Sequence, residues 1–75
     1  MSEPPLLKAS ELIRALQKAG FERIRQKGSH VRLKHPDGRV VTVPIHGNQE
    51  IGRGLLRKIL RDIEWSNEDL SSYLH

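Results

Sequence analysis

The stretch ERIRQKGSHVRLKHPDGRVVTVPI, residues 22–45, decides the fold, because it contains three short segments whose side chains alternate along the chain. Such alternation is typical of β-strands that bury one face. The segments span residues 22–27, 30–35 and 39–45. Gly28-Ser29 separates the first two, and Asp37-Gly38 is a strong hairpin signal between the second and the third. The stretch therefore predicts a three-stranded antiparallel sheet with its strands in chain order.

Helical periodicity precedes the strands. Leu12 and Leu16 belong to an apolar series at helical spacing, which predicts a helix over residues 10–19. We expect Ser10 to be its N-cap. Gly20 follows at the position where a left-handed glycine commonly ends a helix.

Two further helices are expected after the strands. An apolar stripe over residues 51–63 predicts the longer one, which starts nearer residue 53 because two glycines weaken its first turn. Ser66 is expected to cap a short last helix, with Asp69 three residues later completing a capping box.

The resulting order, α-β-β-β-α plus a short terminal helix, is an α+β fold in which helices cover one face of an antiparallel sheet. The expected inward residues are Ile24, Val31, Leu33, Val41, Val43 and Ile45, beneath Leu12, Leu16, Leu55, Ile59 and Leu60. The expected outward residues are Arg23, Arg25, Lys27, His30, Arg32 and Lys34, with the phase of the first strand open by one residue. We expect a single domain over 1–75, divided into a flexible arm (1–9), a core (10–64) and the terminal helix (65–75).

Charge is distributed unevenly along the chain. All thirteen Lys and Arg residues lie between Lys8 and Arg61, where four acids leave a net charge of +9. The segment from Asp62 to His75 carries a net charge of −4. A small body this basic attracts polyanions, nucleic acid first, although the same residues also serve simply to solvate a small domain.

Composition argues against several classes of protein. Without cysteine the chain has no disulfide and no thiolate metal site, which fits a cytoplasmic location. Residues 1–10 lack the basic start and apolar run of a signal peptide. No stretch approaches the roughly 20 apolar residues of a membrane span. Because the histidines fall on different faces without ligand-pair spacing, we expect neither a metal nor another cofactor.

His30 is the sharpest candidate for chemistry. Imidazole titrates near neutrality, so one such residue can take and return a proton. Beside phosphate-binding cations, it can deprotonate a ribose 2′-hydroxyl, which then attacks the adjacent phosphorus while Arg or Lys stabilises the developing charge. This route needs no metal. From spacing alone, however, an exposed strand histidine without a role is the simpler interpretation.

The other candidates carry structural alternatives. His46, after the third strand, can contact a phosphate, act as a second acid or base, or hydrogen-bond its own loop. Gly28 is expected to supply a positive φ or a close backbone approach. Ser29 either donates a hydrogen bond to phosphate or bonds its own turn. His35 is expected to be structural.

In their order and spacing these residues resemble the HicA family of small mRNA interferase toxins. The resemblance covers residues 10–64, with GSH at 28–30, VPIH at 43–46 and GLLRKIL at 54–60. Two departures stand out: Leu55 replaces a threonine that many relatives carry, and the arm at 1–7 and the acidic segment from Asp62 extend the family core.

The resemblance implies a fold like the double-stranded RNA-binding domain and metal-independent cleavage of mRNA by the histidine that matches His30. It further implies a toxin–antitoxin system with a role in stress response, in which a HicB-type antitoxin covers the active surface. Gly28 and Ser29 carry over as motif positions. The expected RNA-binding residues are Gly28, Ser29, Lys27, Arg32, Lys34, Arg25 and His46.

Two other functions stay open at this point. A double-stranded RNA-binding topology reads A-form shape and phosphates without chemistry, so a non-catalytic RNA-binding module is the first alternative. The second is a subunit whose basic face serves only another protein. Cleavage specificity and oligomeric state also stay open.

Overall fold

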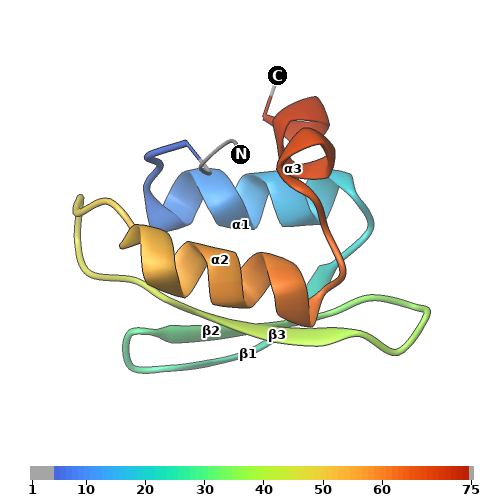
Figure 1. Ribbon diagram of the computed structural model, residues 1–75. Helices are drawn as coiled ribbons and strands as arrows, with labels where there is room; N and C mark the ends of the chain where they lie inside the picture. The colour runs from blue at the N-terminus through green and yellow to red at the C-terminus, as the bar shows by residue number, and fades with distance from the viewer. Residues whose placement is uncertain (1–4, 75) are drawn as a thin grey trace.

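The computed structural model describes residues 5–74 and contains, within that range, three helices and three strands (Figure 1). In chain order they are α1 (Ala9–Lys18), β1 (Glu22–Lys27), β2 (His30–Lys34), β3 (Val40–Pro44), α2 (Arg53–Asp62) and α3 (Asn67–Tyr73). The predicted α+β class and α-β-β-β-α order are confirmed. Among residues 5–74, none of the helices has the length and apolar character that a membrane crossing needs.

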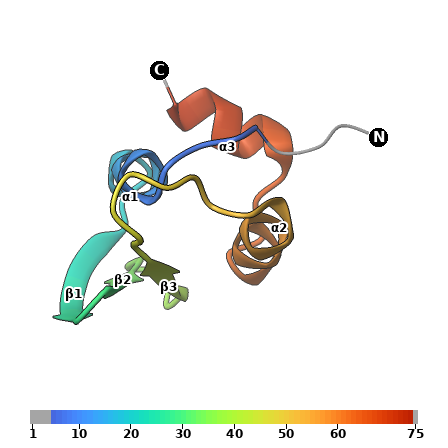
Figure 2. The same cartoon turned by 90° about the vertical axis from the view of Figure 1, so that its left-hand side faces the viewer.

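The molecule is layered. β1, β2 and β3 form one antiparallel sheet in that order, and α1 and α2 cover one of its faces (Figure 1). α3 lies across the helices on the side away from the sheet (Figure 2). No described element covers the other face of the sheet, so that face is open (Figure 2).

The core lies between the sheet and the helices. Val31, Leu33, Val41 and Val43 are buried, as their alternation along β2 and β3 predicts. The prediction that Leu55 covers them is wrong: its side chain is 39% exposed, and Leu56 is buried instead. The buried side of α2 follows a helical series, Leu56, Ile59, Leu60 and Ile63, from which Leu55 is displaced by one position.

β1 departs from the predicted alternation because it contains a β-bulge. Arg23 lies opposite Leu33, and Arg25 lies opposite Arg32, so one extra residue of β1 is inserted between them. The extra residue is Ile24, which is 52% exposed rather than in the core. Arg23 shares the face of Leu33 and not the open face. The expected positions of Ile24 and Arg23 are therefore wrong.

At the ends of α1, the predicted C-terminal glycine is confirmed and the predicted N-cap is wrong. Gly20 has φ +105°, and the Phe21 N–H donates to the Leu16 carbonyl at 3.0 Å, which is the expected left-handed helix end. The N-cap is Lys8, not Ser10. The Glu11 carboxylate accepts a hydrogen bond from the Lys8 N–H at 2.9 Å, so the acid satisfies a free donor at the helix start.

The part of the expected flexible arm from Leu7 to Ala9 is anchored. Leu7 is 2% exposed, and its carbonyl accepts a hydrogen bond from the Ile51 N–H at 2.8 Å. Lys8 forms an antiparallel bridge with Glu50. The chain is therefore held in place from Leu7 onward, and residues 1–4 of the expected arm lie outside the described residues.

Arg39 ties the β2–β3 turn to the helices. Its guanidinium donates to Asp37 at 2.7 Å and to the Ile63 carbonyl at 2.6 Å, at the end of α2. It also lies 5.3 Å from the centroid of the Phe21 ring. One side chain thus fixes the far end of the hairpin against the helical layer.

Candidate nucleic-acid interface

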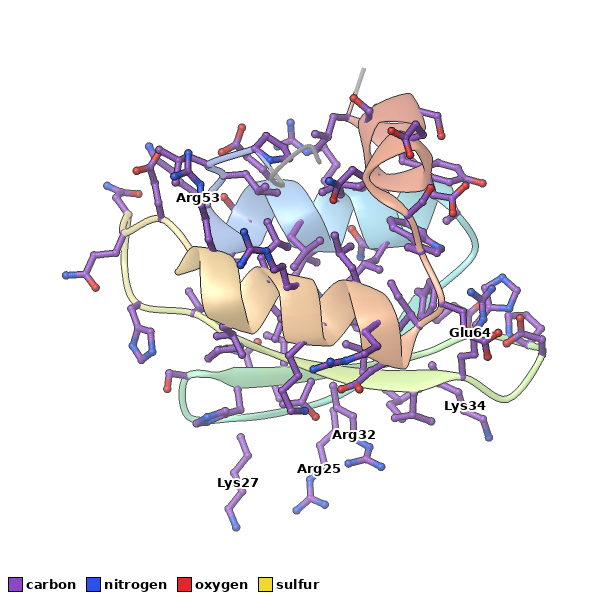
Figure 3. The ribbon with its side chains drawn as sticks, in the orientation of Figure 1. Arg25, Lys27, Arg32, Lys34, Arg53 and Glu64 are labelled. Carbon is purple, nitrogen blue, oxygen red and sulfur yellow. The ribbon has the colours of Figure 1, made fainter. Side chains whose placement is uncertain are left out.

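The open face of the sheet is basic. Arg25 and Lys27 lie directly opposite Arg32 and His30, so all four share one face. Figure 3 shows the side chains of Arg25, Lys27, Arg32 and Lys34 directed away from the helices. Among the strand residues of this face, Glu22 is the only acid.

His30 lies at the start of β2 within a shallow, open depression of about 220 Å³. The depression is lined by Arg25, Lys27, His30, Arg32 and Thr42. His30 is exposed and has Lys27 opposite it on one side and Pro44 on the other. An imidazole in this position is open to solvent and to a large ligand, with three cations close by.

The turn before His30 is well defined. Gly28 has φ +58°, a left-handed conformation that suits glycine, as the sequence predicts. The Ser29 carbonyl accepts a hydrogen bond from the Ile45 N–H at 2.6 Å, which joins the β1–β2 turn to the end of β3. His30 is therefore placed by backbone bonds on both neighbouring strands rather than by contacts of its own ring.

The cations of this face are unpaired. The side chains of Arg25, Lys27, Arg32 and Lys34 make no hydrogen bond or ion pair with any residue in the range 5–74, and neither does the His30 ring. Unpaired guanidinium and ammonium groups keep their donors available for phosphate oxygens. The face is consequently a region of positive potential ready for a polyanion.

The structure separates some of the predicted site residues. Lys34 lies at the far end of β2, in a second depression with Glu22, Ile24, His35 and Pro36. His46 is exposed in the loop after β3 and does not line the His30 depression. The prediction did not include Thr42, which lies opposite Arg32 on β3. Alternation placed Thr42 on the outward side of its strand, but its neighbours follow only from the register.

His35 has the structural role expected of it. Its Nε2 lies 3.1 Å from the Ala19 carbonyl, and its Nδ1 accepts a hydrogen bond from the Asp37 N–H at 3.1 Å. The ring also packs edge-on against Phe21, with centroids 5.0 Å apart. This histidine therefore connects the end of α1 to the β2–β3 turn.

Within residues 5–74 no three His, Asp or Glu side chains gather as metal ligands. The chemistry on the open face comes from one imidazole, three nearby cations and a hydroxyl. Such a set can bind phosphates and move a proton.

The fold and this face define a small α+β domain with an open cationic sheet surface. A family model described as the HicA toxin of bacterial toxin–antitoxin systems matches residues 9–65 of the 75-residue chain. The chain therefore belongs to the HicA toxin family and is the toxin of a toxin–antitoxin system. No curated protein matches it.

Proposed function

We propose that this toxin is a metal-independent endoribonuclease that cleaves mRNA in the cytoplasm, with His30 as its acid and base. The observation that carries the proposal is the position of His30, exposed in a depression among Arg25, Lys27 and Arg32. Because the face is open, an extended RNA strand can reach the imidazole without a conformational change. Membership of a toxin family supports the same conclusion.

In the proposed complex the cations bind the RNA backbone. Arg25 and Arg32 each present a planar fork of donors that suits two phosphate oxygens, and Lys27 presents a compact charge next to His30. Gly28, Ser29, Lys34 and His46 extend this contact surface towards both ends of β2. Phosphate contacts of this kind position the strand without reading its sequence.

The proposed chemical step is an internal transfer. His30 takes the proton from a ribose 2′-hydroxyl, whose oxygen forms a bond to the adjacent phosphorus. The bond from phosphorus to the 5′-oxygen of the next nucleotide breaks, and that oxygen receives the proton that His30 took up. The products are a 2′,3′-cyclic phosphate and a 5′-hydroxyl. Arg25, Lys27 and Arg32 stabilise the negative charge that develops on the phosphoryl oxygens.

The antitoxin in this proposal is a HicB-type protein that binds over the open face. Unpaired cations on an exposed sheet favour a partner with complementary acidic groups. Covering the face also removes His30 from RNA, so binding and inhibition are one event.

The product ends test the proposed chemistry. Purified toxin, incubated with RNA in excess EDTA, is expected to leave 2′,3′-cyclic phosphate and 5′-hydroxyl ends, because the nucleophile belongs to the substrate. End-specific labelling of the fragments distinguishes these products. Fragments with 3′-hydroxyl ends would contradict the internal transfer, and a loss of cleavage in EDTA would contradict metal independence.

The same assay separates the enzyme from a non-catalytic RNA-binding module. The exposed basic sheet fits either function, and only the enzyme shortens the RNA. Intact RNA after long incubation with toxin that shifts it in a gel would assign the face to binding alone.

A further inference from the structure

The second depression lies at the opposite end of β2 from His30, where Glu22 and Lys34 of the open face meet His35 at the β2–β3 turn. It has a volume of about 140 Å³ and is lined by Glu22, Ile24, Lys34, His35 and Pro36. We propose that it is a subsite for one nucleobase of the RNA strand, with a preference for cytosine. This inference rests on the proposed function, since it assumes that RNA lies across the same face.

The walls of the depression suit the flat face of a base. Ile24 is half exposed because the bulge in β1 turns it out of the core, and Pro36 adds a rigid apolar surface. The ring of His35 is held by its bonds to Ala19 and Asp37. Because the His35 ring and Pro36 are already held in place, these two walls lose little freedom when a ligand binds.

The volume matches a single ring. A cavity of about 150 Å³ lined by apolar side chains holds one benzene molecule. The depression, at about 140 Å³, is of that size, so a pyrimidine ring fits it and a purine projects beyond it.

The two charged groups of the depression have distinct roles. Lys34 and Glu22 lie opposite each other, and neither side chain makes an ion pair or hydrogen bond within the described residues 5–74. The ammonium group suits the phosphate of the bound nucleotide. The carboxylate accepts from the exocyclic amino group of cytosine, whereas uracil presents a carbonyl oxygen at the same position and is disfavoured.

The subsite is within reach of an RNA strand that passes His30. His30 and Lys34 are four residues apart on one strand, which is about 13 Å at the rise of a β-strand. At about 3.4 Å per nucleotide along a stacked strand, this distance corresponds to no more than about four nucleotides. Arg32 of the first depression and Lys34 of the second both lie on the open face, so the basic surface is continuous between them.

Binding of uncleaved RNA tests the inference. In the His30→Ala background, fluorescence anisotropy compares short oligocytidine and oligouridine at neutral pH. We expect oligocytidine to bind about fivefold more tightly, at the low end of what side-chain contacts to base edges give. Adding Glu22→Gln is expected to reduce the ratio below about twofold, because an amide also offers a donor to uracil. Glu68→Gln removes the same charge from α3, on the far side of the helices, and is expected to leave the ratio unchanged.

Each outcome decides one of the two proposals. Equal affinity for the two oligomers, or a ratio that Glu22→Gln leaves intact, overturns the subsite. Ile24→Ser provides a second comparison. If this variant weakens antitoxin binding but leaves RNA binding unchanged, the depression is a protein contact and the nucleobase subsite is overturned. If the wild-type toxin prefers oligocytidine but never cleaves RNA, the proposed function fails and the subsite stands.

Discussion

Gly20 joins α1 to the sheet in a left-handed conformation that suits glycine. Its φ is +105°, and a Cβ there would lie 3.1 Å from the His35 Nε2 atom. Gly38 has nearly the same φ, +101°, with open space around it. The two glycines therefore form a matched pair in which only the surroundings differ.

We expect Gly38→Ala to lower the free energy of unfolding by about 1–2 kcal/mol, the cost of a side chain in the left-handed region. Gly20→Ala is expected to cost more, because it also displaces the His35 ring from its bond to Ala19. Urea unfolding followed by the fluorescence of Trp65, the only tryptophan, measures both. Equal losses in the two variants would show that the His35 contact contributes nothing.

Asp37 gives the β2–β3 turn a dependence on pH. The hydrogen bond from the Arg39 N–H, helped by the Arg39 guanidinium, holds the pKa of this carboxyl below its usual value. Because folding lowers this pKa, the ionised Asp37 carboxylate stabilises the folded protein at pH values above the pKa of the unfolded chain. This stabilisation is lost as the pH falls through the folded pKa, below about pH 4. We expect the stability difference between wild type and Asp37→Asn to be largest near neutrality and to close on acidification. Thermal unfolding of both proteins across that range measures it, and a difference that grows towards low pH would contradict the account.

At this scale the sequence predicts what depends on local chemistry. The sequence predicts the helix end at Gly20 and the N-cap at Ser66, because both features are determined by adjacent residues. The Ser66 hydroxyl accepts a hydrogen bond from the Asp69 N–H at 3.0 Å, as predicted. The sequence does not predict Lys8 as the N-cap of α1, because that position depends on the hydrogen bond between Leu7 and the distant Ile51. A contact between distant segments leaves no signal in either segment alone.

Among the elements, β1 shows where alternation fails. β2 and β3 are predicted correctly because both are covered by helices, which forces apolar residues onto one face. β1 is exposed along its whole length, so no burial fixes its phase, and the bulge at Ile24 shifts it. The extra residue is visible only when the register with β2 is known.

α3 depends on a single buried anchor. Leu70 is fully buried, and Trp65 stacks on Tyr73 with centroids 5.1 Å apart. We expect Leu70→Ala to lower the free energy of unfolding by about 2–4 kcal/mol, a large part of the stability of so small a domain. Ser71→Ala, at the exposed neighbouring position, is expected to change it by less than about 0.5 kcal/mol. Urea titration of the two variants provides the comparison, and similar losses would show that α3 is not anchored through Leu70.

For the whole molecule, the layered arrangement determines where a ligand can bind. Both helices that cover the sheet lie on one side, so the other face keeps its cations free (Figure 2). The sequence predicts that His30, Arg25, Lys27 and Arg32 meet there, because two alternating strands joined by a tight turn place them side by side. It does not predict that Lys34 belongs to a separate depression, since that depends on the bulge and the β2–β3 turn.

Salt dependence reports how many of these cations bind phosphate. Each contact with a single strand is expected to add about 0.7 to the slope of log affinity against log salt. Lys27→Gln is therefore expected to reduce the slope by about that amount. Lys58→Gln, whose lysine on α2 already bonds Asp62, serves as the control and is expected to leave it unchanged. Filter binding over a range of salt measures the slopes, and an equal reduction in both variants would place the RNA elsewhere.

The most direct test of the account is the single-turnover rate of RNA cleavage by His30→Ala, with protein in excess over substrate and affinity measured separately. Because general acid–base catalysis contributes about 10²–10⁴-fold, we expect the rate to fall by at least about 100-fold. RNA affinity is expected to change little, since the cations remain. A rate equal to that of the wild type would show that the imidazole on the open face is not the catalyst.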